Sequence, residues 1–228
     1  KVLNYSTNNT VTYLKTIAKK HKIQALLGQS FQKSDFEYSF IQGQGLPNDN
    51  LKYLTSASQN TSFSSSATSY AYESFFGRLN YSFVGTYLLG VSMRNDGSSR
   101  FGANKQYGWF PAISAGYIIS NTDYFRKSGL GKYIDLLKIK TSYGKTGNSE
   151  IANFASRGLY STSYYGSTGG LYPTQLANSN LSWEKNSQWD AGLELSIFKS
   201  RISASVDYFN KLTKDMLLSM PVPSTSGY

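Results

Sequence analysis

The sequence lacks cysteine altogether and has a single histidine, His21, among its 228 residues. Disulfide bonds, thiolate metal sites and cysteine nucleophiles are therefore excluded, and so are metal sites that need several histidines. His21 lies in the basic run Lys19-Lys20-His21-Lys22, which we interpret as a solvated turn and not as part of a catalytic site. We expect no metal and no cofactor.

The chain also lacks long apolar runs. No stretch of about 20 consecutive apolar residues occurs, so a transmembrane helix is excluded, whereas a transmembrane β-strand needs only about 9–11 residues. The mean hydropathy of −0.39 fits a soluble protein, but it fits a barrel with a polar lumen and polar loops equally well. No signal-peptide pattern is present, and neither terminus resembles a natural one, so we expect a piece of a longer protein.

The chain has a net charge of +10 at pH 7, which could suit nucleic acid or an anionic membrane surface. Apart from the run at positions 19–22, the basic residues are scattered singly. Basic residues interleaved with Tyr and Phe are also found on surfaces that bind single-stranded nucleic acid. Here most aromatic residues share a strand face with aliphatic ones and most basic residues take the other face, so we expect no nucleic-acid partner.

Polar and apolar residues alternate with a period of two, which is typical of β-strands with two different faces. The pattern is clearest on either side of Val84-Gly85, where Leu79, Tyr81, Leu89 and Val91 share one face. About eight strands are predicted, many of them longer than the usual five or six residues. They are Thr10–Ala18, Lys22–Lys33 with an extension to Ile41 left open, Tyr72–Phe83, Thr86–Asn95, Gln106–Ser120, Asp135–Thr146, Leu181–Phe198 and Arg201–Leu212.

The connections between these strands alternate in length. Lys19–His21, Val84-Gly85 and Lys199-Ser200 are short, and the intermediate connection Asn121–Tyr133 is expected to hold a short helix capped by Asn121 or Thr122. Long loops are expected at Gln42–Ser69, at Asp96–Lys105 and at Gly147–Asn180; in the first, residues 47–50 would cap a helical turn and Ser56–Ser69 would be mobile. Short turns at one rim and long loops at the other are typical of outer-membrane barrels.

The fold class predicted is all-β: an antiparallel transmembrane β-barrel, here an incomplete barrel wall with long loops at one rim. Aromatic residues near both ends of the strands fit the two girdles of such a barrel. A soluble β-sandwich would give the same alternation and stays open on pattern alone. In the barrel, one set of residues faces lipid: Leu79, Tyr81, Leu89, Val91, Ile113, Tyr117, Leu193 and Leu195. The other set faces the lumen: Arg78, Asn80, Ser82, Lys138, Lys140, Asp190 and Glu194.

A series of short motifs follows these strands in order. They are Gly77-Arg78-Leu79-Asn80-Tyr81, Arg94-Asn95-Asp96-Gly97-Ser98-Ser99-Arg100-Phe101-Gly102, Gly108-Trp109-Phe110-Pro111, Ser142-Tyr143-Gly144-Lys145-Thr146-Gly147-Asn148 and Asn180-Leu181-Ser182-Trp183-Glu184. Each motif alone is weak, but the ordered series resembles the SusC/RagA family of TonB-dependent outer-membrane transporters.

The resemblance implies a barrel of about 22 strands closed by an N-terminal plug. Residues 1–228 would be an internal part of that barrel, without the plug, the closing strands or the segment that contacts TonB. The expected function is active import of oligosaccharides or peptides across the bacterial outer membrane, energised through TonB and paired with a SusD-like lipoprotein lid. Such a protein is not an enzyme, and besides TonB and the lid its barrel contacts outer-membrane lipid. The alternative is a soluble or surface-attached β-rich binding module, such as an adhesin.

Two segments are candidate sites. The loop Gly147–Asn180 carries Arg157, Tyr160, Tyr164, Tyr165 and Tyr172, and long loops of this kind are usually functional or disordered. Tyr supplies amphipathic contact area at low entropic cost, so we expect this loop to contact the ligand or the lid. The alternative is a mobile rim loop without a ligand role.

In the second segment, Arg94, Asp96 and Arg100 surround Gly97-Ser98-Ser99 and could bind an anion through backbone N–H groups. We expect instead a structural loop held by its own Asp and Ser hydrogen bonds. The carboxylate pairs Asp190 with Glu194 and Asp35 with Glu37 share a face, as in a glycosidase, but carboxylates on a lumen face more often solvate a pore. We therefore expect no catalysis.

Overall fold

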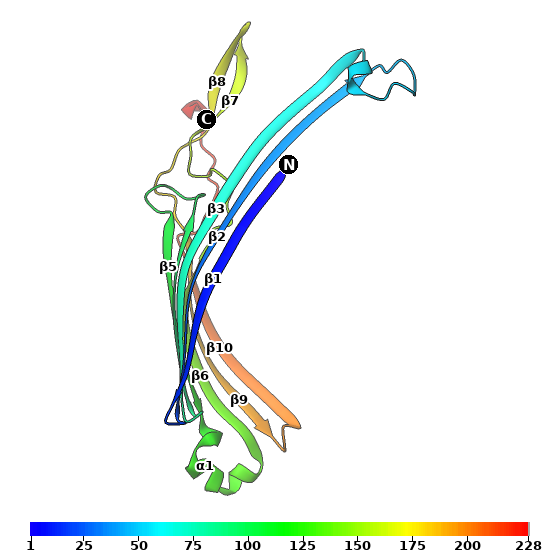
Figure 1. Ribbon diagram of the computed structural model, residues 1–228. Helices are drawn as coiled ribbons and strands as arrows, with labels where there is room; N and C mark the ends of the chain where they lie inside the picture. The colour runs from blue at the N-terminus through cyan, green and yellow to red at the C-terminus, as the bar shows by residue number, and fades with distance from the viewer. Residues whose placement is uncertain (228) are drawn as a thin grey trace.

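The computed structural model describes residues 1–227. Its main feature is a curved, eight-stranded antiparallel sheet in the order β1-β2-β3-β4-β5-β6-β9-β10, and a separate hairpin is formed by β7 and β8 (Figure 1). The strands are β1 (Val2–Ile17), β2 (His21–Gln44), β3 (Gln59–Phe83), β4 (Tyr87–Ser98), β5 (Tyr107–Ile118), β6 (Ile134–Asn148), β7 (Leu159–Tyr165), β8 (Thr168–Gln175), β9 (Glu184–Ile197) and β10 (Ile202–Lys214).

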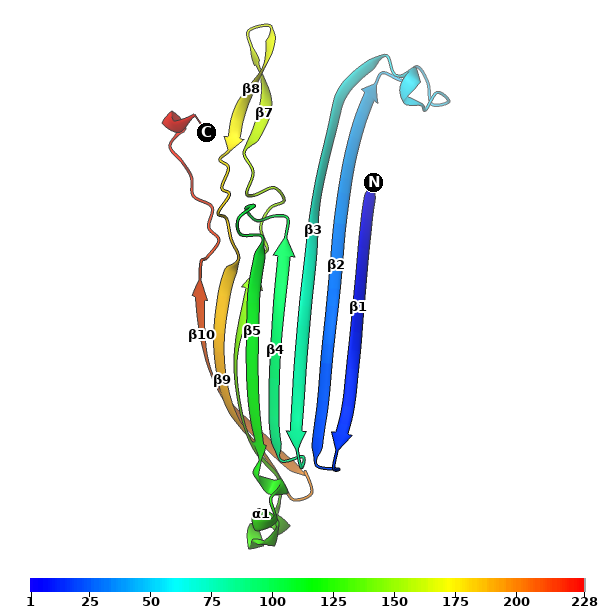
Figure 2. The same ribbon diagram turned by 60° about the vertical axis from the view of Figure 1, so that its left-hand side comes forward.

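The main sheet is open. Strands β1 and β10 form its two edges, each pairing with one neighbour only among the described residues (Figure 2). The predicted all-β class and the predicted incomplete barrel wall are therefore confirmed. An open edge leaves a row of backbone groups unpaired, which is costly in lipid, so the open sheet is consistent with an incomplete barrel.

The two faces of the sheet differ in the way the alternation predicts. On one face Leu79 lies opposite Val91, Val91 opposite Ile113 and Ile113 opposite Tyr143, and all four side chains are exposed. The other face is hollowed, with a volume of about 1080 Å³ whose lining includes the polar side chains of Asn80, Ser114 and Lys140 as well as apolar ones such as Leu88. A barrel wall is concave toward its lumen, so the polar face is the lumen face and the exposed apolar row is the lipid face.

Aromatic side chains mark both ends of the lipid face. At the short-turn end the ring of Tyr87 stacks on Phe83 and Tyr117, with centroids 6.1 and 5.1 Å apart. At the other end Trp109 lies in the same row as the exposed Phe75. Trp109 and Tyr117 are eight residues apart along β5, about 26 Å along the strand, which is about 20 Å across the membrane for a strand tilted by about 40° and so fits within the apolar band of about 25 Å of an outer-membrane barrel.

Strands β2 and β3 are longer than predicted, at 24 and 25 residues. The prediction that Ser56–Ser69 is a mobile loop is wrong, because Ser64 and Ser66 lie in β3 opposite Phe40 and Tyr38 of β2. Strand β1 likewise begins at Val2 and not at Thr10. These extensions pair through the backbone beyond the aromatic row, where no lipid requires an apolar face, and so the parity that faces lipid in the wall carries polar residues there, such as Glu37 and Ser39.

Three tight turns lie at one end of the main sheet. Residues 18–20, 84–86 and 198–201 join neighbouring strands there, with Lys19, Val84 and Lys199 at positive φ. His21 is not part of the turn: it begins β2, is half-buried, and its Nδ1 lies 2.7 Å from the Tyr81 hydroxyl. The interpretation of His21 as a solvated turn residue is therefore wrong.

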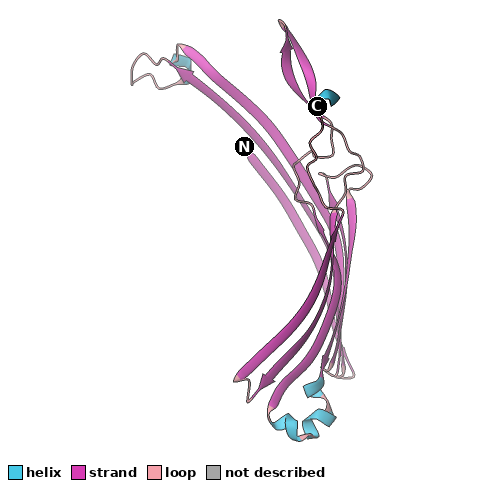
Figure 3. Ribbon diagram, turned by 180° about the vertical axis from the view of Figure 1, so that it is seen from behind, coloured by secondary structure: helices cyan, strands magenta, loops and turns pink. Residues whose placement is uncertain are grey.

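Short helical segments occupy two connections (Figure 3). Helix α1 (Asp123–Lys127) follows Thr122, whose Oγ1 accepts a hydrogen bond from the backbone N–H of Phe125, so the predicted cap by Thr122 is confirmed. The helical turn expected after residues 47–50 begins later, at the 3-10 segment Leu54–Ser56, and has no side-chain cap. Among the described residues, no helix has the length and apolar character needed to cross a membrane.

Candidate functional site at the long-loop rim

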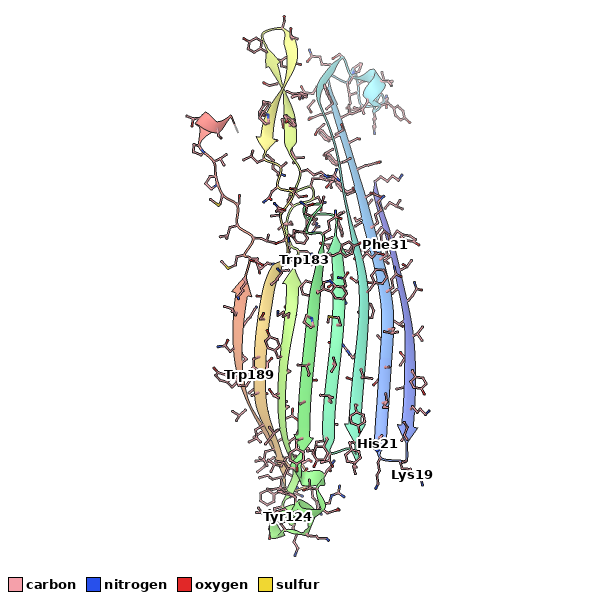
Figure 4. All side chains as sticks on the ribbon, turned by 90° about the vertical axis from the view of Figure 1, so that its left-hand side faces the viewer. Lys19, His21, Phe31, Tyr124, Trp183 and Trp189 are labelled. Atoms are coloured by element: carbon pink, nitrogen blue, oxygen red, sulfur yellow. The ribbon has the colours of Figure 1, made fainter. Side chains whose placement is uncertain are left out.

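A small aromatic cluster lies at the long-loop ends of the wall strands. Phe101, Phe110 and Trp183 are exposed by only 1%, 7% and 5%. The Trp183 ring lies 4.8 Å from that of Phe101 and 5.4 Å from that of Phe110, and its Nε1 donates to the Gln106 carbonyl at 2.8 Å (Figure 4). Two segments distant in sequence, residues 101–110 and the segment of Trp183, are thus fixed together where the loops leave the barrel wall.

Phe101 is buried because the segment that carries it folds back on its neighbours. The Ser99 N–H donates to the Ala71 carbonyl, and the Ser99 Oγ accepts from the Ala71 N–H at 2.9 Å. The Gly102 N–H donates to the Leu181 carbonyl, and a Cβ at position 102 would collide with the Ser179 carbonyl. The Gly102 position therefore requires glycine for close approach of two backbones.

The charged residues of the same segment have partners inside the protein. The Arg94 Nε donates to both Asp96 carboxylate oxygens at 2.6 and 2.8 Å, and its second guanidinium nitrogen donates to the Ser74 Oγ. Ser98 Oγ accepts from the Arg100 N–H at 3.3 Å, while Gly97 lies in β4 opposite Tyr107. The Arg94–Asp96 pair thus lies within β4, and the hydrogen bond from Arg94 to Ser74 links β4 to β3.

Arg100 joins the segment to the loop after β6. Its guanidinium donates to Asn153 Oδ1 at 2.8 Å and to the Tyr72 hydroxyl at 2.9 Å, and it lies over the Tyr70 ring at 4.5 Å. Asn153 in turn donates to Thr68 Oγ1 at 2.8 Å. The contacts of Arg94 and Arg100 thus organise the rim and engage both guanidinium groups within the protein.

Residues 147–180 are not the irregular loop that the sequence led us to expect. They contain the hairpin β7–β8, closed by a tight turn with Gly166 at φ +64°, and this hairpin projects beyond the wall (Figure 1). Its tyrosines are exposed: Tyr160 by 66%, Tyr164 by 84%, Tyr165 by 89% and Tyr172 by 49%. The Thr and Tyr residues of this segment also favour β-strands.

Arg157 lies at the base of this hairpin. Its guanidinium is 5.4 Å above the Phe154 ring, and its carbonyl accepts from the Gln175 side-chain amide at 2.7 Å. Phe154 also borders a cavity of about 290 Å³ together with Phe36 and Thr68. The segment that leads into the hairpin therefore lies next to the extended part of β2 and β3.

Sequence reasoning missed an aromatic row on the same extension. Phe36, Tyr38 and Phe40 have the parity of the lumen-facing residues and lie opposite Thr68, Ser66 and Ser64. Small partners leave the three aromatic rings uncovered, with exposures of 40%, 46% and 42%. Their spacing of two residues was the available signal. The row adds stacking surface to the mouth of the lumen, next to the cavity at Phe154.

Charged side chains on the lumen face form a connected chain. Lys138 Nζ lies 3.2 Å from Glu194, Lys140 Nζ lies 2.9 Å from the other Glu194 oxygen, and Lys140 also lies 2.9 Å from Asp207. Asp190 accepts hydrogen bonds from Ser142 and Gln188, so the carboxylates considered for glycosidase chemistry are held by neighbours. The part of the chain that the structure describes contains no group of three or more side chains suited to a metal.

Comparison with known proteins agrees with this geometry. The family model "TonB dependent receptor-like, beta-barrel" matches residues 2–228. TonB-dependent receptor P39 of Formosa agariphila is 37% identical over 99% of this chain and 22% of that protein. TonB-dependent receptor SusC of Bacteroides thetaiotaomicron is 31% identical over 99% of this chain and 22% of that protein.

Solved structures agree as well. The structure of the RagAB peptide transporter superposes with a TM-score of 0.90 at 34% identity, over 100% of this chain and 25% of that chain. This chain thus spans about a quarter or less of the relatives that it matches. The family match over nearly every residue and the open wall lead to one conclusion: the chain belongs to the TonB-dependent receptor β-barrel family, whose members are outer-membrane proteins.

Proposed function

We propose that this chain forms part of the wall and rim of an outer-membrane importer that is energised through TonB and takes up oligosaccharides or peptides. The observation that carries the proposal is the wall itself, with an exposed apolar row on one face and, on the other, a hollow of about 1080 Å³ that contains charged residues such as Lys138, Lys140 and Asp190. A soluble binding module would have to cover residues such as Leu79 and Ile113, which are exposed here. The plug, the remaining strands and the segment that contacts TonB would be supplied by the rest of the transporter.

The partner in this proposal is a SusD-like lipoprotein that closes the lumen from the long-loop side. The hairpin β7–β8 projects from that rim, and Tyr160, Tyr164 and Leu171 are exposed on one of its faces. Tyrosines of this kind are favoured at protein interfaces because a rigid ring buries a large area while its hydroxyl stays hydrogen-bonded. The same rim carries Phe36 and Tyr38, which would contact the ligand beneath the lid.

Replacing Tyr160, Tyr164, Tyr165 and Tyr172 together by Ser in the full transporter is expected to weaken lid retention about tenfold or more, because interface tyrosines often contribute over 1 kcal/mol each. Copurification of the lipoprotein and uptake of the nutrient measure the effect. Tyr124→Ser is the matched control, because Tyr124 is 89% exposed at the opposite rim. Heat-modifiable electrophoretic mobility checks that every variant still folds.

The outcomes are distinct. Normal folding with lost lid retention and reduced uptake supports the proposal. Normal lid retention and normal uptake in the fourfold variant would assign no partner or ligand role to the hairpin. An equal loss in Tyr124→Ser would show that the effect is not specific to the long-loop rim.

A further inference from the structure

Basic residues gather at the short-turn end of the wall. Of the 23 Lys and Arg, seven lie in the connections there, and of the 13 Asp and Glu, only Asp123 and Asp135 lie in or next to them. This end therefore holds a net charge of +5, half of the +10 of the whole chain. The seven residues, which we name the basic rim, are Lys19, Lys20, Arg126, Lys127, Lys132, Lys199 and Arg201.

The structure brings the basic rim together from three distant segments. Residues 18–20, 119–133 and 198–201 are far apart in sequence, yet all three connections lie at the same end of the sheet (Figure 2). In Figure 4 the labelled Lys19 and Tyr124 lie at this end, beyond the strands. The scattered charges of the sequence thus become one surface only through the strand topology.

The cations of the basic rim lack acidic partners. All seven side chains are exposed, and within residues 1–227 none of them takes part in an ion pair. Asp135, the nearest acid on β6, instead accepts a hydrogen bond from the Ser200 N–H at 2.9 Å. Elsewhere in the chain several cations are paired, such as Lys33 with Asp35 and Lys185 with Asp215. The rim charges are therefore available to an anion from outside the chain.

The position of the basic rim relative to lipid indicates which anion. The stacked rings of Phe83, Tyr87 and Tyr117 form the last aromatic row of the lipid face, and the turns begin immediately beyond it. The rings of Tyr133 and Phe198, which flank the basic connections, lie 6.1 Å apart. Aromatic side chains take the level of the lipid headgroups, so cations just beyond this row lie at the depth of the lipid phosphates.

We propose that the basic rim binds the phosphate headgroups of anionic phospholipids in the membrane leaflet at the short-turn end. This surface would draw anionic lipids to the barrel and fix its depth in the bilayer. The inference rests on the proposed function only in taking the wall to be membrane-embedded, and it requires neither the lid nor transport.

The test measures lipid selectivity directly. The full transporter is reconstituted into phosphatidylcholine vesicles with spin-labelled phosphatidylglycerol or spin-labelled phosphatidylcholine, and electron spin resonance gives the relative binding of each to the protein. We expect a preference for phosphatidylglycerol of about fivefold, the factor that a single basic residue contributes at an anionic surface. High salt should remove most of it, because exposed charges are screened.

Lys19, Lys20, Lys127, Lys132 and Lys199 are replaced by Gln together, and we expect most of the preference to be lost. The same five positions as Arg keep the charge and should keep the preference. Lys52→Gln with Lys105→Gln removes exposed cations from the long-loop rim and should leave it unchanged.

A preference that survives in the fivefold Gln variant, or that is lost in the Lys52 and Lys105 control, would overturn the proposal. Nutrient uptake by each variant is measured separately and tests the importer. If the fivefold Gln variant loses uptake but keeps normal lipid selectivity, the result would count against a lipid role for these cations and favour a protein partner at the same rim.

Discussion

Ile113→Arg in the full transporter is expected to lower barrel stability by about 2–4 kcal/mol, the cost of a basic side chain at the middle of the lipid face. Ile113 is 50% exposed on the apolar face and lies opposite Val91 and Tyr143. It is four residues from Trp109 and four from Tyr117, the aromatic residues of the two girdles on β5. An arginine there is too far from either interface for its guanidinium to reach the headgroups easily.

The adjacent residue of the same strand provides the control. Ser114 borders the polar hollow and lies opposite Gly90 and Ser142, so Ser114→Arg places the same charge in the lumen at the same depth. Denaturant unfolding in detergent or lipid, followed by heat-modifiable mobility, measures both variants. We expect Ser114→Arg to cost much less than Ile113→Arg. Equal costs, or a larger cost for Ser114→Arg, would mean that the two faces have been assigned the wrong way round.

The wall could be predicted from sequence because the membrane constrains every second residue. Leu79, Val91 and Ile113 must be apolar to meet hydrocarbon, while Asn80 and Ser114 border a wet lumen, and so the alternation reports the fold directly. The tight turns and the Thr122 cap follow from local chemistry of the same kind, whereas the long-loop ends of β1, β2 and β3 do not. The alternation predicts only those parts of the chain that cross the membrane.

Beyond the membrane the same backbone pairing continues without that constraint. Ser64 and Ser66 have the composition of a loop, and they are strand residues because β2 offers them backbone partners. The hairpin β7–β8 was missed for a similar reason, since Gly-rich and Tyr-rich segments form either loops or exposed strands. Composition could single out Tyr160 and Tyr164 as candidate contact residues, but it could not predict the strand in which they lie.

The rim cluster was missed because its contacts join distant parts of the chain. Trp183 donates to the carbonyl of Gln106, 77 residues away, and Phe101 lies in a segment otherwise rich in Gly and Ser. No local pattern predicts such a contact. Both residues do fall within the motifs that resemble the family, which indicates that those motifs describe the packing of the rim more than any ligand chemistry.

The cluster leads to the second large expected effect. Phe101→Ala should cost about 3–5 kcal/mol of local stability, as for other buried Phe side chains, because the cavity between Trp183 and Phe110 cannot collapse against a rigid sheet. The loss should be confined to the rim: the wall strands are held by their own pairing and by lipid, so the barrel remains folded while the segments that follow β4 and β6 open.

Hydrogen exchange is the appropriate measurement, because it reads local opening. The amides of Ser99 and Gly102 are hydrogen-bonded to Ala71 and Leu181, and in Phe101→Ala they should exchange more than a hundredfold faster, while amides of β5 in mid-membrane keep their protection. Phe63→Ala is the matched control, since Phe63 is 88% exposed on β3 and should change neither set. Uniform loss of protection through β5 would show that the cluster stabilises the wall itself. Unchanged exchange at Ser99 and Gly102 would show that the hydrogen bonds alone hold the rim, in which case the buried ring of Phe101 contributes little.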